Sequence, residues 1–416
     1  IEVMSGHGNS EEYRDWREVV YDASGKPSCP EPSPDYLPSC WRAGEIVEAR
    51  CLKADLDAAE CAARAAAARQ NYTDAGVAGH RAVPGVLAEE WLDAGQCRDC
   101  FLPAFNYRPG GSSQYALAIT NFDDPANPRN FRFGFIASSD NHQARPGTGY
   151  KEFGRRGNTE ARGAESAKWR SRLLGEPEPA DPQSHAVDLA IARQGLNVLE
   201  TERQASFFMT GGLAAAHAEG RSRDAVWNAL ERKEVYGTSG DRILLWFHLL
   251  NAPARAGGVS AVPMGGEVRM AAAPRFEVRA VGAQQQKPGC PDFSEQTLDA
   301  ARLEALCMGE CFNPSDERKL ITRIEVVRIR PQLQPGEPVG GLIDDPWRVF
   351  PCEPSQAGCV VQFEDPEFAT SPRPATYYVR AIEAPSPTVN AKNLRCETDA
   401  SGRCVKVNPC YGDYRT

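Results

Sequence analysis

The chain has 416 residues, of which 41% are hydrophobic and 25% charged, a balance typical of a globular protein. Its net charge of −9 and the lack of a lysine- or arginine-rich stripe argue against nucleic-acid binding through phosphate neutralisation. No apolar run in the sequence approaches the roughly 18–20 residues of a membrane-spanning helix, so we expect no transmembrane segment. This length favours two domains over a single core.

The first half of the chain predicts alternating short strands, loops and helices. Residues 55–70 are rich in alanine and predict a helix by propensity alone. Residues 84–94 predict a second helix that begins with a proline. The apolar stretch 131–139 predicts a buried strand that ends abruptly in small polar residues.

The second half of the chain changes character at about residue 251. Ser222 is a plausible N-cap for a helix whose buried stripe would be Val226, Ala229 and Leu230. Residues 243–250 predict a strand. Beyond it, short alternating stretches punctuated by Gly, Pro and Cys predict a β-rich region, either a small sandwich or a sheet packed on the first domain.

The cysteines are numerous and lie mostly in loop-like, Pro- and Gly-rich surroundings. Their even count of 14 predicts loops closed by disulfides in an oxidising compartment, the periplasm or the cell exterior. The alternative is a structural zinc site formed by the pairs Cys97/Cys100 and Cys307/Cys311, which the large separation of the pairs disfavours. The sequence leaves the pairing open.

A candidate metal site lies in "FGFIASSDNHQARPGTGY", residues 133–150. Asp140 and His142 are two residues apart, and in a strand such residues point to the same side. A carboxylate beside an imidazole suits Zn, Mn or Fe. The alternative is a loop cap beside a surface histidine.

A second stretch, "IEVMSGHGNSEEY" at residues 1–13, has the same form. An apolar strand carrying Glu2 ends in a turn that presents His7 between two glycines, which let the backbone approach a ligand. Taken together, the two stretches favour a shared site more strongly than either does alone.

Four ordered stretches resemble the C-terminal half of the DUF3604 family, which is related to the PHP (polymerase and histidinol phosphatase) metallohydrolases. They are "IEVMSGHGNSEEY", "FRFGFIASSDNHQARPGTGYKE", "AVWNALERKEVYGTSGDRILLWF" and "PATYYVRAIEAPSPT". The similarity is good over about 1–20, 117–152 and 208–250 and weaker at 318–387.

The resemblance implies an α/β fold, the C-terminal half of a PHP-type distorted (β/α) barrel followed by a β-rich, disulfide-stapled region. Residues 1–250 would form the barrel part, with a Cys-rich insertion at about 22–105 and a surface excursion at about 143–184. Residues 251–416 would form the β-rich part.

The resemblance also implies a cluster of two or three divalent metal ions, Zn, Mn or Fe, at the strand ends. Asp140 and His142 match its last metal motif, His7 matches an earlier ligand, and Glu2 stands at an acidic strand position. The family's opening His-x-His motif has no counterpart here, so we expect an upstream N-terminal half to complete the site.

The function implied is a secreted or periplasmic metal-dependent hydrolase whose small-molecule substrate is a phosphate ester. Arg145, Lys151 and Arg242 are candidates for binding that substrate; the alternative for each is a solvated surface charge. The alternative function is a non-catalytic extracellular binding or structural protein on the same scaffold.

Overall fold

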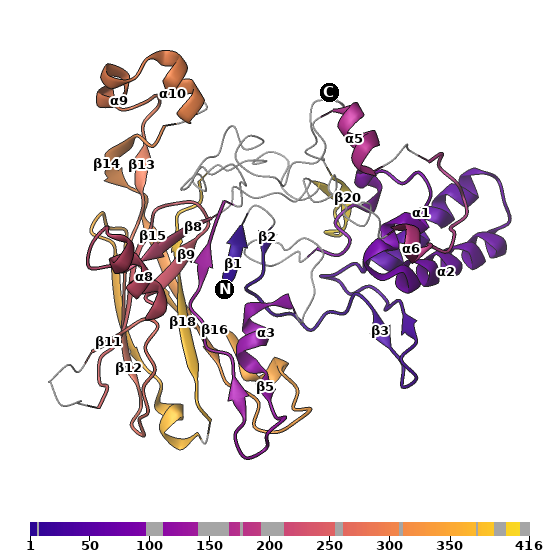
Figure 1. The fold of residues 1–416 in the computed structure, drawn as a ribbon. Coiled ribbons are helices and arrows are strands. Elements are labelled where there is room, and N and C mark those ends of the chain that lie inside the picture. Colours follow the sequence, from indigo (N-terminus) through magenta and orange to yellow (C-terminus); the bar gives the residue numbers. More distant parts are fainter. Residues whose placement is uncertain are drawn as a thin grey trace.

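The computed structural model describes residues 1–5, 8–96, 111–139, 166–174, 178–192, 212–253, 261–307, 311–371, 373–386 and 397–407. The chain forms a β-sandwich, a small group of strands at its side, and a separate helical lobe (Figure 1). This mixed α/β composition confirms the coarse fold class. The strands within the described ranges form open sheets, so the expected barrel stays a prediction.

The sandwich consists of two antiparallel sheets packed face to face. One sheet has the order β11 (Val262–Pro263), β10 (Leu244–Leu249), β12 (Arg275–Val281), β17 (Cys359–Glu364). The other has the order β16 (Ile343–Pro351), β15 (Ile321–Ile329), β18 (Thr376–Glu383). The first sheet thus includes β10, the strand expected at 243–250.

Alternation of side chains along the strands builds the core of the sandwich. On β12, Phe276, Val278 and Ala280 are buried while the residues between them face outward. Phe276 packs against Phe363 of β17 with ring centroids 5.2 Å apart, and Ile324 of β15 belongs to the same cluster. Such aromatic pairs contribute beyond the area that they bury.

The outer face of the three-stranded sheet is covered by the short helix α3 (Ser113–Ala118). Leu117 of α3 packs on Val327 and Ile329, which point away from the sandwich core. One small ladder follows α3, β5 (Thr120–Asn121) with β6 (Arg129–Asn130), and the 3₁₀ turn η5 (Gly340–Leu342) precedes β16. The central strand β15 therefore has buried side chains on both faces of the sheet.

The small strand group joins the first stretch of the chain to the segment before residue 140. Its sheet has the order β2 (Gly8–Asn9), β1 (Glu2–Ser5), β7 (Ile136–Ala137). The hairpin of β8 (Leu213–Ala216) and β9 (Val235–Thr238) packs beside β7, and α8 (Arg223–Glu231) connects its two strands.

Helix α8 confirms one prediction and corrects another. The Ser222 side chain accepts a hydrogen bond from the Ala225 amide, as expected of an N-cap. Only Ala229 of the expected stripe is buried, whereas Val226 is 40% and Leu230 43% exposed. Within the described residues α8 packs on β8 of a two-stranded hairpin, a narrow surface that leaves most of the expected stripe uncovered.

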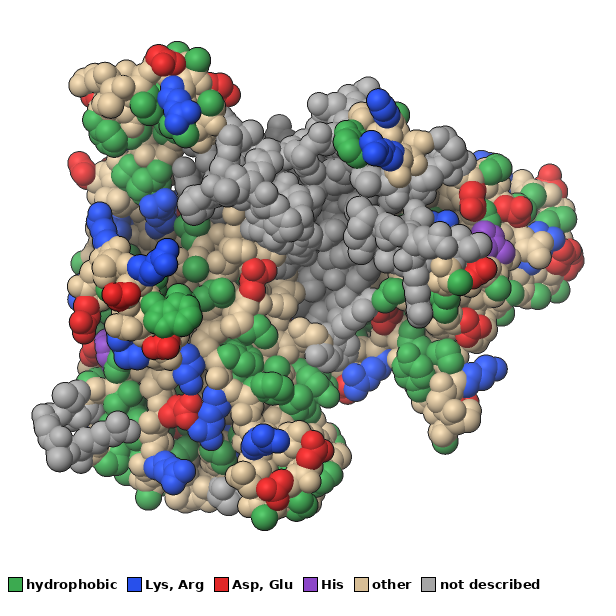
Figure 2. Space-filling view, viewed as in Figure 1, with side chains coloured by type: hydrophobic (Ala, Val, Ile, Leu, Met, Phe, Trp, Pro, Cys, Tyr) green, Lys and Arg blue, Asp and Glu red, His purple; other side chains and the backbone are tan. Residues whose placement is uncertain are grey.

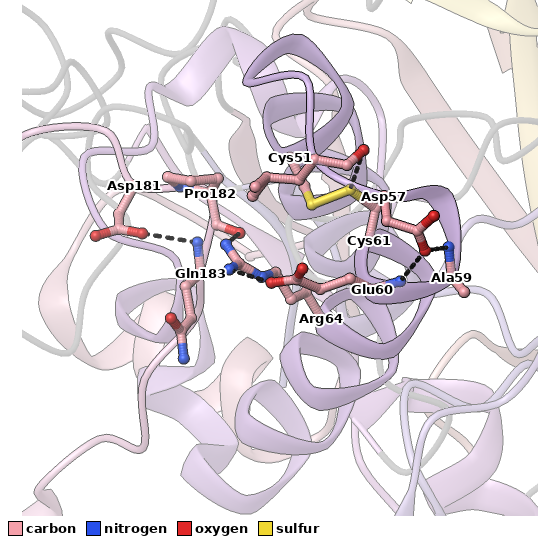
Figure 3. The surroundings of a disulfide bond; sticks show 10 residues. Cys51, Asp57, Ala59, Glu60, Cys61, Arg64, Asp181, Pro182 and Gln183 are labelled. Atoms are coloured by element: carbon pink, nitrogen blue, oxygen red, sulfur yellow. Dashed lines mark hydrogen bonds and ion pairs between the residues drawn. A yellow bond between two sulfur atoms is a disulfide. The ribbon is translucent and has the colours of Figure 1, made fainter.

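The helical lobe is an antiparallel pair, α1 (Ser39–Lys53) and α2 (Ala58–Ala75), and α2 confirms the helix expected at 55–70. Asp57 caps α2 by accepting from the amides of Ala59 and Glu60, and the Cys51–Cys61 disulfide closes the loop between the helices (Figure 3). Val47, Tyr72 and Trp91 belong to the core of the lobe. Smaller elements are β3 (Val20–Tyr21), β4 (Pro27–Ser28), η1 (Gly76–Ala82), η2 (Ala88–Trp91), α5 (Ala167–Leu174), α6 (Leu189–Ala192), β19 (Glu397–Thr398) and β20 (Cys404–Lys406).

The helix expected at 84–94 is instead the short 3₁₀ turn η2. Gly85 and Leu92 both adopt positive φ, 58° and 50°, which an α-helix cannot accommodate. The proline before Gly85 therefore opens a turn and not a helix.

Disulfides are present, as the cysteine pattern predicted. Those within the described residues are Cys29–Cys40, Cys51–Cys61, Cys290–Cys311 and Cys352–Cys359. Since Cys311 is bonded to Cys290, the suggested zinc pair Cys307/Cys311 is not what this structure forms; Cys97 and Cys100 lie outside the described ranges. Among the helices that the structure describes, none combines the length and the apolar character needed to cross a membrane.

Candidate functional site

The two stretches that predicted a shared site lie on neighbouring parallel strands. In β1 and β7, Glu2 pairs with Ile136 and Met4 with Ala137, and the Ser138 amide donates to the Met4 carbonyl at 3.0 Å. Parallel strands end at the same edge of their sheet. The segments that leave β1 at Ser5 and β7 at Ser138 therefore start from one edge.

Glu2 bridges these two strands. Its Oε2 accepts a hydrogen bond of 2.8 Å from the Ser138 hydroxyl, two residues before Asp140. The side chain is exposed, so the carboxylate remains accessible. His7, Asp140 and His142 lie outside the described residues, so whether Glu2 joins them at a metal stays a prediction.

A third strand end reaches the same edge through close backbone packing. The Gly212 amide donates to the Ser138 carbonyl at 2.6 Å, and a Cβ on Gly212 would lie 2.5 Å from the Ala137 Cβ and 2.7 Å from the Thr238 carbonyl oxygen. Gly237 on β9 is equally close, since its Cβ would lie 2.9 Å from the Ala137 Cβ. Only glycine lets the β8–β9 hairpin approach β7 this closely.

The loop after β9, "SGDR" at 239–242, holds a charged cluster that the sequence analysis did not identify. Lys319 Nζ donates to both carboxylate oxygens of Asp241, at 2.8 and 2.9 Å, and to the Ser386 hydroxyl at 3.3 Å. Glu383, at the end of β18, accepts from the Ala283 amide at 2.5 Å. Asp241 and Glu383 lie within two of the quoted stretches and Lys319 lies outside them, and nothing in the sequence shows that the three side chains meet.

Glu383 titrates near neutral pH. Burial raises the pKa of its carboxyl group to about 7, and the nearby Asp241 carboxylate acts in the same direction, while Lys319 opposes them. The loop after β9 is thus fastened to the sandwich by a lysine between carboxyl groups, one of which changes charge near pH 7.

Arg242, a candidate for substrate binding, lies against Phe312, the residue after Cys311. Its guanidinium carbon is 3.8 Å from the centroid of the Phe312 ring, a cation–π distance. Arg145 and Lys151 lie outside the described residues. Figure 2 shows lysine and arginine side chains interspersed with aspartate and glutamate over the visible face of the sandwich, without a field of one sign.

A buried ion network fixes the segment that follows β2. Arg380 of β18 donates to Glu11 at 2.6 Å and to both oxygens of Asp345 at 2.6 Å, and these three side chains are 11%, 7% and 8% exposed. Tyr378 and Gln114 complete the network through hydrogen bonds to Glu11 and Asp345. The network anchors the β1–β2 hairpin, and so one side of the candidate site, to the sandwich.

Residues 120–288 match the model of a family described as "Protein of unknown function (DUF3604)". The match includes β7, the β8–β9 hairpin, the loop with Asp241 and the first strands of the sandwich. No curated protein and no solved structure matches the chain.

Proposed function

The chain carries a DUF3604 region at residues 120–288, and from this premise we propose that it is a secreted or periplasmic metal-dependent hydrolase of phosphate esters. The site would lie at the edge where β1, β7 and β9 end. The observation that carries the proposal is the parallel pairing of β1 with β7, because it starts the His7 segment and the Asp140/His142 segment from one edge.

The donor set at this edge fits a divalent cation. Glu2, His7, Asp140 and His142 would offer carboxylate oxygens and imidazole nitrogens, the ligands preferred by Zn, Mn and Fe. The Glu2 carboxylate is accessible and already lies at hydrogen-bond distance from Ser138. An upstream part of a PHP-type barrel would supply the remaining ligands of a two- or three-metal cluster.

Bound metal would lower the pKa of a water molecule and balance the charge of a phosphate ester. The chain's own residues would then act by position. Glu2 links the two ligand-bearing strands through Ser138, and Lys319 holds the loop after β9 through Asp241. Arg145 and Lys151 remain candidates for contacting the phosphate.

The disulfides and the absence of a membrane-spanning helix among the described helices agree with a location in the periplasm or outside the cell. The competing proposal, a binding or structural protein on the same scaffold, differs from the hydrolase in one measurable respect, its metal content.

The test is elemental analysis of the native full-length protein, beside the double variant Asp140→Ala/His142→Ala. We expect two or more divalent ions per chain in the native protein and their loss in the variant. The matched control is His248→Ala/Asp316→Ala, which removes the same two side-chain types from sandwich strand β10 and from β14 (Pro314–Arg318). Metal retained in the Asp140→Ala/His142→Ala variant, or no metal in the native protein, would overturn the proposal. If the native protein holds metal but releases no phosphate from a panel of phosphoesters, only the binding protein is left.

A further inference from the structure

An arm rises from one end of the sandwich between the two strands of a short ribbon. The ribbon is β13 (Gln284–Gln286) with β14 (Pro314–Arg318), and the arm carries helices α9 (Asp292–Thr297) and α10 (Ala300–Cys307) (Figure 1). Neither helix has a buried residue. Phe293 is 71% and Leu306 50% exposed. With so little apolar burial, the conformation of the arm depends on covalent closure.

That closure is the Cys290–Cys311 disulfide, and a third cysteine stands beside it. The sulfur atoms of Cys290, Cys307 and Cys311 all lie within 4.8 Å of one another. Cys307 ends α10 four residues before Cys311, and both Cys290 and Cys307 are partly exposed. Three sulfur atoms at one place cannot all be joined in one disulfide.

We propose that Cys290, Cys307 and Cys311 form a thiol–disulfide exchange site. The Cys307 thiolate attacks the Cys311 sulfur, the new Cys307–Cys311 bond forms, the Cys290–Cys311 bond breaks, and Cys290 leaves as a thiolate that takes up the proton lost from Cys307. The step is neutral in electrons and needs no outside oxidant or reductant. Proximity makes it intramolecular, because a rotation about side-chain bonds covers the remaining distance.

The geometry favours exchange over a metal site at the same three residues. A zinc ion needs thiolates as ligands, whereas two of these sulfur atoms are already bonded to each other. The Cys352–Cys359 disulfide provides a contrast in the same chain, because no group of three metal-binding side chains includes it within the described ranges.

Exchange would change the shape of the arm. The Cys290–Cys311 bond spans 21 residues and encloses both helices. A Cys307–Cys311 bond encloses only the few residues between these two cysteines and releases the segment between β13 and α9 that carries Cys290. Phe312, next to Cys311, lies against Arg242, so the change would reach the loop that follows β9.

The test is thiol trapping in the intact full-length protein. The protein is held at pH 8 without added thiol, acidified to stop exchange, labelled with N-ethylmaleimide near pH 6.5, and digested with pepsin for mass spectrometry. We expect the label on Cys290 in some molecules and on Cys307 in others, with matching Cys307–Cys311 and Cys290–Cys311 peptides. The Cys352–Cys359 peptide, the internal control, stays intact and unlabelled.

Two variants make the outcome decisive. Cys290→Ser is expected to form the Cys307–Cys311 bond, and Cys307→Ser to keep the Cys290–Cys311 bond with no label on either cysteine. Label confined to Cys307 in the native protein, or Cys307 bonded to a cysteine outside the three, would overturn the proposal. So would a Cys290→Ser protein labelled on both remaining cysteines.

Discussion

Replacing Arg380 with alanine should destabilise the protein strongly. The guanidinium pairs with Glu11, Asp345 and Glu325, whose side chains are 7%, 8% and 14% exposed. The Arg380→Ala variant removes this counter-charge from the buried Glu11 and Asp345, while Glu325 keeps its ion pair with Arg323. Removing one partner of a buried ion pair costs about 3–5 kcal/mol in the free energy of unfolding. We expect a loss in that range at pH 7.

The pH dependence of the loss tests its electrostatic origin. Burial acts to raise the pKa of Asp345, but the hydrogen bonds and charge of Arg380 outweigh it and hold the pKa below its ordinary value. In the native protein this group contributes stability above the unfolded-state pKa of about 3.9, and the contribution is lost as the pH falls through the lower folded-state pKa. Without Arg380, burial is opposed only by the Gln114 hydrogen bond and the charge of Arg14, so the pKa of Asp345 rises and protonation relieves part of the loss. The difference between native and variant should therefore shrink from pH 7 toward pH 4.

Urea denaturation followed by tryptophan fluorescence at pH 7, 5.5 and 4 measures both effects. The control is Arg323→Ala on the neighbouring strand β15, which also pairs with Glu325 but is 43% exposed. An exposed pair of this kind contributes less than about 1 kcal/mol. The reasoning fails if Arg380→Ala costs no more than the control, or if its cost is the same at pH 7 and pH 4.

Three further predictions concern single positions. Gly237→Ala should lower the free energy of unfolding, measured by urea denaturation, by about 1–3 kcal/mol, because the new Cβ would lie 2.9 Å from the Ala137 Cβ and 3.0 Å from the Ala137 amide nitrogen. The control Gly220→Ala has open space around it and should change that free energy by less than about 0.5 kcal/mol. Glu383 has a folded-state pKa of about 7, above its unfolded value, so its contribution is complete below about pH 4.3 and is lost as the pH rises through 7. Between pH 5 and 7 the free energy of unfolding of the native protein should therefore fall relative to that of Glu383→Gln, by at most about 1.4 kcal/mol per pH unit. Thermal or urea unfolding measures it, and parallel curves of this free energy against pH for the two proteins would refute the prediction. Asp57→Ala should cost about 1 kcal/mol and Asp57→Asn less, since the asparagine oxygen still accepts from the first amides of α2; equal losses for both would argue against the cap.

Local structure was predictable where a single segment determines it. The alanine-rich stretch became α2, the apolar run at 243–250 became β10, and Ser222 caps α8 as expected. The match at residues 120–288 confirms the DUF3604 resemblance, which rested on short motifs at strand ends. Each of these signals lies within about twenty residues of sequence, so no long-range contact has to be known.

The parts that escaped prediction depend on partners far apart in the chain. Glu11 and Arg380 are 369 residues apart, and neither residue shows by its neighbours that it will be buried with the other. The same holds for the Asp241 loop, because Lys319, 78 residues further along the chain, and Glu383, still later, come together with it only in the folded protein. The exposed Val226 and Leu230 were misassigned because periodicity identifies an apolar face but not whether a neighbour covers it.

The candidate site combines both kinds of information. Its candidate ligands were proposed because they lie in or directly after a strand in short motifs, and the pairing of β1 with β7 brings those two strands together. What holds the edge in place comes from the sandwich: Arg380 fastens the segment after β2, and Lys319 fastens the loop after β9. The β-rich region thus contributes to the candidate site by position, because its two cations add to the β1–β7 pairing in holding the β1–β2 hairpin and the Asp241 loop.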